Sequence, residues 1–148
     1  MATLRETILA ALQTDAALAA ILIGGVYGEP ISKGHTPGAF DGAKGGKLRP
    51  CAVLSFETSA PDGPIPGCER QFFTVYFYDH RGYANVDAAQ RRVKVLLDRR
   101  ANVDLGIDGL VYEFRHAEDS RDLRDPELDD APMRFSRYSA VLNTAVHM

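Results

Sequence analysis

The segment of residues 69–79 constrains the fold most strongly, because bulky side chains occupy both its odd and its even positions. Alternation over this length predicts a β-strand. One face would carry Phe73, Val75 and Phe77, and the other Phe72, Thr74, Tyr76 and Tyr78. A strand with large side chains on both faces must be covered on both sides. The second cover is either another layer of the same chain or another chain.

Three segments are predicted to be helices, and the apolar residues of the first and the third have amphipathic spacing. The first begins at Thr3, whose hydroxyl can cap the helix while Glu6 reaches back. A second N-cap at Thr14 or Asp15 precedes the apolar segment 16–22, which Gly24 and Gly25 end. The third helix spans residues 83–100. Further strands are predicted at residues 26–27, 50–57, 110–116 and 133–146, the last with Tyr138, Ala140, Leu142, Thr144 and Val146 on one face.

Two long segments between these elements lack regular patterning. Residues 28–49 are rich in glycine and proline and are predicted to form a long loop or a loose hairpin arm. Residues 118–130 carry seven acidic side chains and are predicted to form a solvated connector. The resulting order of elements predicts an α+β fold, with a mostly antiparallel sheet of about four strands and helices packed on one face. We expect residues 1–148 to form a single domain.

Composition narrows the classes of function. Seventeen basic and 20 acidic residues give a net charge of −3, which argues against a general binder of nucleic acid or membrane surfaces. Apolar segments such as residues 16–23 are too short to span a membrane, and we expect no secretory signal. Cys51 and Cys68 are too few for a disulfide framework or a zinc site, which indicates reduced cysteines in a cytosolic setting.

Motifs of catalysis and cofactor binding are missing. Residues 42–48 resemble a phosphate-binding loop, but Asp41 replaces its first glycine and Leu48 its hydroxyl residue. The four histidines are His35, His80, His116 and His147. No two of them have the i, i+4 spacing of a metal-binding helix, and none lies near a cysteine at the spacing of metal ligands. We therefore expect a protein that is not an enzyme, with no catalytic residue, no metal and no cofactor.

Charged and aromatic side chains form candidate interaction surfaces. The basic side chains of segment 91–100 would lie away from the apolar stripe of their helix, as a solvated face, a protein-binding face or a phosphate-binding face. The acidic connector offers a complementary surface, and aromatic residues of the central strand offer interface anchors. The candidate interface residues are Arg91, Arg92, Arg99, Asp122, Asp125, Glu127, Phe72 and Tyr76.

The order of elements resembles that of a known family. The matching features are the N-terminal helix with Leu4, Ile8 and Leu12, the pair Arg49–Pro50 that opens a strand, the aromatic strand 72–78, the helix 86–97 and the closing segment 134–141. In this plan the chain resembles the tail terminator proteins of long-tailed bacteriophages, which are also called tail-completion or head-tail joining proteins.

The resemblance implies a structural role in a virion. Such proteins form a ring, commonly hexameric, on the head-proximal end of the tail tube, where they stop tube polymerisation and join the tail to the capsid neck. The implied partners are further copies of the chain, the tail tube protein and a neck or head-completion protein, with assembly in the host cytoplasm and no membrane. Duplex DNA would pass through the lumen without specific binding, so we expect a neutral or acidic lumen with Arg91, Arg92 and Arg99 outside it.

Other functions remain open on the sequence. The chain could be a different neck component, such as a head-completion or connector protein. It could also be a small enzyme or ligand-binding module, for which a stable monomer with one deep polar pocket would be typical. A nucleic-acid binder would show salt-dependent binding.

Overall fold

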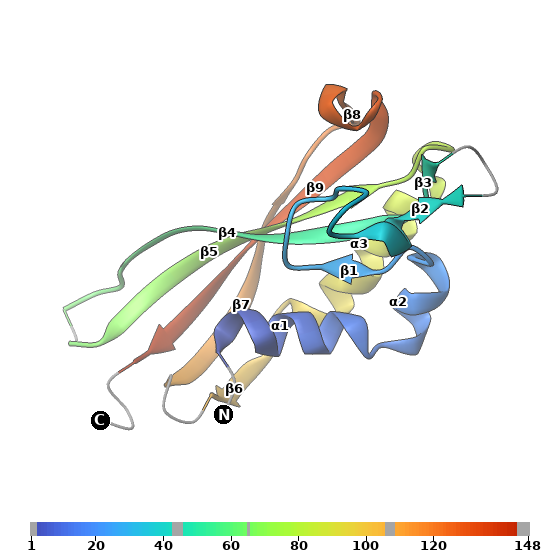
Figure 1. The fold of residues 1–148 in the computed structure, drawn as a ribbon. Helices are drawn as coiled ribbons and strands as arrows, with labels where there is room; N and C mark the ends of the chain where they lie inside the picture. The colour runs from blue at the N-terminus through green and yellow to red at the C-terminus, as the bar shows by residue number, and fades with distance from the viewer. Residues whose placement is uncertain (1–2, 43–45, 65, 106–108, 145–148) are drawn as a thin grey trace.

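A curled sheet of seven strands forms the frame of the protein in the computed structural model, which describes residues 3–42, 46–64, 66–105 and 109–144. The strand order is β1-β4-β5-β9-β7-β6, and β8 pairs with β9 (Figure 1). A separate two-stranded sheet consists of β2 and β3. The strands are β1 (Val26–Tyr27), β2 (Phe40–Asp41), β3 (Lys47–Leu48), β4 (Cys51–Pro61), β5 (Cys68–Tyr78), β6 (Ala101–Asp104), β7 (Leu110–Asp119), β8 (Leu123–Asp125) and β9 (Ala131–Asn143).

The predicted α+β fold with a four-stranded antiparallel sheet and helices packed on one face is wrong. Strands hold 43% of the residues and helices 27%, so the chain is mostly β. The sheet is also mixed, because β1 runs parallel to β4. The sequence analysis missed β6 and β8, which have only four and three residues. The sheet also extends past the helices, since β4 and β5 continue as an arm beyond α1 (Leu4–Gln13) (Figure 1).

Side-chain caps fix the beginnings of the two N-terminal helices. The Thr3 hydroxyl accepts a hydrogen bond from the Glu6 amide at 3.1 Å, as predicted. Asp15 caps α2 (Ala16–Ile21) by accepting from the Leu18 amide at 2.9 Å. These caps satisfy amide groups that the first turn of a helix leaves without partners. The third helix, α3 (Ala84–Leu97), has no such side-chain cap. No helix in the described part of the chain is long and apolar enough to cross a membrane.

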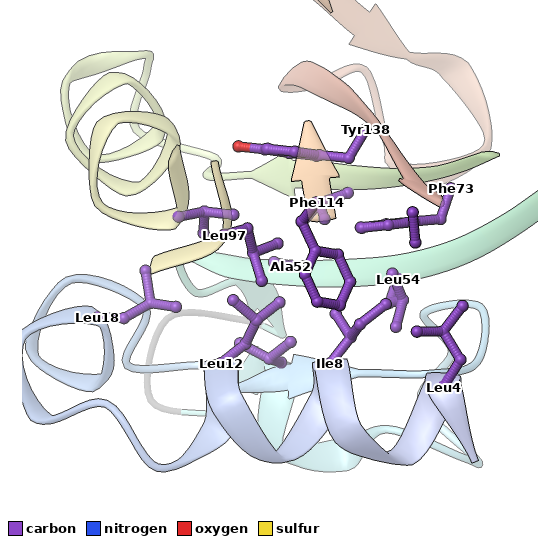
Figure 2. Close-up of a cluster of buried hydrophobic side chains, with 14 of the residues drawn as sticks. Leu4, Ile8, Leu12, Leu18, Ala52, Leu54, Phe73, Leu97, Phe114 and Tyr138 are labelled. Atoms are coloured by element: carbon purple, nitrogen blue, oxygen red, sulfur yellow. The ribbon is translucent and has the colours of Figure 1, made fainter. Parts of the chain in front are cut away.

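The main core lies between the helices and the sheet. Figure 2 shows Leu4, Ile8 and Leu12 of α1 pointing toward side chains of the strands. Phe73 is fully buried there and stacks on Tyr138 with ring centroids 5.6 Å apart. Phe114 meets Phe73 edge-on at 6.2 Å. Burial of these rings, at about 25 cal/mol per Å² of apolar surface, is the dominant stabilising contribution of the core.

The opposite face of β5 has a second, smaller core. Segment 28–49 contains a 3-10 helix (Pro37–Ala39) and the antiparallel pair β2–β3, which agrees with the hairpin arm among the two predicted alternatives. It buries Ala39 and Leu48 against Cys51, Val53 and Tyr78. A second layer of the same chain therefore covers the Tyr78 end of the strand. Tyr76 is only partly buried at the border of this cluster.

The acidic segment after β7 is more structured than a solvated connector. Residues 123–125 form β8, and the 3-10 helix Pro126–Leu128 follows, with the Asp125 side chain accepting from the Glu127 amide at 3.0 Å. β8 pairs with the start of β9, where Arg124 lies opposite Pro132. Three sets of residues named in the sequence analysis lie outside the described residues. They are Val146 of the predicted C-terminal strand, His147, and residues 43–45 of the glycine-rich segment.

Neighbouring phenylalanines on opposite faces of β5 test this arrangement. Phe73→Ala should lower the free energy of unfolding by about 3–5 kcal/mol, because it leaves a cavity in the main core. Phe72→Ala should lower it by only about 1 kcal/mol, because the ring is half-exposed and loses mainly its cation–π contact with Arg137. Urea unfolding of both variants measures the difference, and equal losses would contradict the assignment of faces.

Candidate docking surfaces

A shallow groove lies where the second core ends on the sheet. Val53, Tyr76 and Ile31 contribute apolar side chains to its lining, and its volume is about 290 Å³. The Phe135 ring lies beside Tyr76 with a centroid distance of 5.8 Å, because the two residues are directly opposite in the β5–β9 ladder. Aromatic side chains that are only partly covered are typical anchors of protein interfaces.

Two carboxylate side chains also line this groove. Asp125 and Glu127, at the end of β8 and in the 3-10 helix after it, line the groove together with Leu128. Burial and the hydrogen-bonded Asp125 carboxylate raise the pKa of Tyr78 above its ordinary value. We name the set Val53, Tyr76, Ile31, Asp125, Glu127 and Leu128 the acidic groove.

Phe72 lies further along the same face, in a polar setting. The Arg137 guanidinium carbon lies 4.5 Å from the centre of the Phe72 ring. Arg137 Nε donates to Glu57 Oε2 at 3.0 Å, and the Thr74 hydroxyl donates to the other oxygen of Glu57. Arg137 therefore covers part of the Phe72 ring, whereas Tyr76 and the largely buried Tyr78 line the acidic groove.

The outer face of α3 has the opposite character. Val95 is 71% exposed, although Val93 and Leu97 on either side of it are buried in the main core. Arg91 precedes Val95 by four positions and is exposed, and residues four apart on a helix share a face. Lys94 is the exposed residue before Val95 in the chain, and exposed Arg99 follows the end of α3, with a left-handed backbone at a φ of 64°. We name Arg91, Lys94 and Val95 the basic helical face.

Arg92 has an internal role. Its Nε and Nη2 atoms donate to the two carboxylate oxygens of Asp15 at 2.8 and 2.7 Å, so the ion pair joins α3 to the beginning of α2. This bidentate geometry is the strongest arrangement of such pairs. The hydrogen bond from Arg92, together with that from the Leu18 amide, lowers the pKa of Asp15 from 3.8 to about 2. Arg92 therefore differs from Arg91 and Arg99, because its guanidinium group binds a carboxylate of its own chain.

The remaining acidic candidate lies apart from the groove lining. Asp122 is exposed, and its Oδ1 lies 3.6 Å from Arg134 Nε. Arg134 also donates to Asp87 of α3 at 2.6 Å and to the Ser120 carbonyl at 2.7 Å. Asp122 thus belongs to the network that connects the acidic segment to α3.

The structure brings three of the eight candidate residues together and separates the rest. Tyr76, Asp125 and Glu127 meet in the acidic groove. Arg91, Arg92 and Arg99 lie on the helix side of the sheet. The sequence analysis missed Val95 and Ile31. Val95 could have been found, because a valine beside the buried positions Val93 and Leu97 falls off the apolar stripe. Ile31 carried no signal, because it lies in a segment without periodicity.

Polar residues under the C-terminal half of α3 form a further cluster. Asp119 Oδ1 accepts from Ser136 Oγ at 2.6 Å and contacts His116 Nε2 at 2.9 Å, while Gln90 donates to Ser136 Oγ at 3.1 Å. Desolvation opposes ionisation of Asp119, but the hydrogen bonds from Ser136 and His116 lower its pKa below the ordinary value. These contacts hold α3 against β7 and β9. Among the described residues, no group of three or more His, Cys, Asp or Glu side chains could hold a metal ion.

Comparison with known proteins gives a finding about the fold. No protein-family model and no curated protein matches the sequence. Among solved structures, the chain is similar to a chain in the virion of a native gene transfer agent particle. The two share 19% sequence identity with a TM-score of 0.72, and the match covers 95% of each chain. At this identity the match shows that the two chains share a fold over nearly their whole length.

The Asp15–Arg92 pair predicts a defined dependence of stability on pH. The pKa of Asp15 is lower in the folded chain than its ordinary value, so the pair stabilises the fold fully above pH 3.8 and loses this effect as the pH falls toward 2. Asp15→Asn, which keeps a capping side chain, should flatten the fall in unfolding free energy between these values.

Arg92→Gln should flatten the same curve, because it removes the other partner of the pair. Urea unfolding at a series of pH values measures all three proteins. A fall as steep in both variants as in the unmodified chain would contradict the assignment.

Proposed function

We propose that this chain is a virion structural protein that forms a hexameric ring and caps the head-proximal end of a phage tail tube. In this role it stops tube polymerisation and joins the tail to the capsid neck. The observation that carries the proposal is the shared fold, which extends over 95% of both this chain and a chain of a gene transfer agent virion. The order of elements, which resembles tail terminator proteins, agrees with this role.

The surfaces of the chain support assembly rather than chemistry. The acidic groove and the basic helical face are unlike one another, and they lie on opposite sides of the sheet. Contacts between two different surfaces of identical chains are heterologous, and they form a ring when the rotation between neighbours closes. A terminator needs such closure, because an open series of contacts would continue indefinitely.

The partners follow from the proposed position. One rim of the ring would bind the tail tube protein and the other a neck or head-completion protein, in a virion assembled in the host cytoplasm. Duplex DNA would pass through the lumen without specific binding. The net charge of −3 supports a lumen that does not retain DNA, because each phosphate contact would add a salt-dependent attraction. Arg91, Arg92 and Arg99 would then lie outside the lumen.

A different neck component is the second candidate, since a fold shared with a virion chain also fits a head-completion or connector protein. The two roles differ in ring size and in partner. Native mass spectrometry separates them, because a terminator should have six times the 16.2 kDa chain mass and a connector twelve times.

Electron microscopy of tail tubes tests the proposed role directly. When the purified protein is mixed with tail tubes of its own virus, rings should bind at one end of each tube, and further addition of tube protein should no longer lengthen that end. The control is tubes incubated without the protein, which should continue to grow. Rings found along the tube wall, or tubes that grow past the bound protein, would contradict the proposal.

A further inference from the structure

We infer that neighbouring copies of this chain associate head to tail, with Val95 of one copy seated in the acidic groove of the next. The inference rests on the proposed ring, and it identifies the two surfaces that close it. The occupant of the groove is thus a second copy of this chain. Its basic helical face supplies both the apolar side chain and the positive charges around it.

Apolar complementarity is the first argument. Val95 is 71% exposed on a charged face, so a free chain leaves a branched apolar side chain in water. The groove of about 290 Å³ offers apolar side chains of Val53, Ile31 and Tyr76 in its lining. Transfer of a valine side chain from water to such surroundings is favourable. The surrounding residues would exclude water from this contact, as the periphery of an interface does around an anchor residue.

Charge complementarity is the second argument. Arg91 lies one helical turn before Val95, Lys94 is the exposed residue before it in the chain, and exposed Arg99 follows the end of the helix. Asp125 and Glu127 line the groove. Docking of Val95 in the groove therefore brings cations toward these carboxylates. The same arrangement disfavours contact between two grooves or between two helical faces, because like charges would meet.

The positions of the two surfaces on the molecule are the third argument. α3 packs on one side of β5 through Val86, Val93 and Leu97, in the cluster that contains Phe73. Tyr76 points to the other side, into the second cluster. Val95 faces away from the sheet, so it and the groove point in opposite directions. A copy docked at one surface leaves its own second surface free for the next copy, as a closed ring requires.

Site-specific cross-linking tests the contact. In a Cys68→Ser background, with buried Cys51 retained, Val95→Cys and Glu127→Cys are prepared as separate proteins and joined with a short bismaleimide, both free in solution and bound to tail tubes. The mixture should give a cross-linked dimer, and neither protein alone should. A chain with both substitutions should give a ladder of products that ends at the ring number. The matched control replaces Glu127→Cys with Glu6→Cys, an exposed position on α1, and should give no dimer above background.

A second pair of variants tests the anchor without cross-linking. Val95→Asp places a carboxylate against Asp125 and Glu127 of the acidic groove, and should abolish the ring in native mass spectrometry and on tubes while leaving the thermal unfolding midpoint unchanged. Ile23→Asp makes the same change at another exposed apolar residue, 59% exposed after α2, and should leave the ring intact.

The outcomes separate this inference from the proposed function. Rings that cross-link through Val95 and Glu127 but do not bind tube ends would support the contact and contradict the terminator role. Rings that cap tubes while this pair cross-links no better than the control would overturn the contact and leave the role standing. Dimers from Val95→Cys alone, or equal loss of the ring in Val95→Asp and Ile23→Asp, would also overturn the contact.

Discussion

The two-sided bulk of β5 is the constraint on which the rest of the structure depends. Phe73, Val75 and Phe77 require a cover of helices, while Tyr76 and Tyr78 require a cover on the opposite side. The helices cover the first of these faces completely, since Phe73, Val75 and Phe77 are all fully buried. Segment 28–49 covers Tyr78 but leaves Tyr76 half-buried at its edge. The acidic groove lies where segment 28–49 leaves Tyr76 partly uncovered.

The proposed assembly follows from this incomplete cover. A sheet face that its own chain only partly covers gains stability when a neighbour completes the burial. The opposite side of the molecule provides a suitable neighbour surface, because α3 carries an exposed Val95 among basic residues. The Asp15–Arg92 pair holds α3 to α2 and so fixes the orientation of that surface. Rigid placement of both surfaces allows one repeated geometry between copies.

The predictability of each element from sequence depended on how strongly local pattern decides its structure. The Thr3 cap, the Asp15 cap and the central strand were predicted correctly, because hydroxyl or carboxylate caps and apolar alternation are local signals. β6 and β8 were not predicted, because pairing with β7 and β9 rather than local propensity makes them strands. The fold class was wrong because β6, β8 and the parallel strand β1 make the sheet larger and mixed. The groove was predictable only in part, since the sequence indicated Tyr76 and Glu127 but not that Ile31 from a distant segment would join them.

The central claim is that copies of this chain meet through two different surfaces and close a circle. A cryo-electron microscopy reconstruction of the protein on the end of a tail tube measures this most directly. The account predicts a hexameric ring in which α3 of every copy faces the Tyr76 side of its neighbour. A reconstruction in which identical surfaces meet about a twofold axis, or in which isolated copies bind the tube separately, would contradict it.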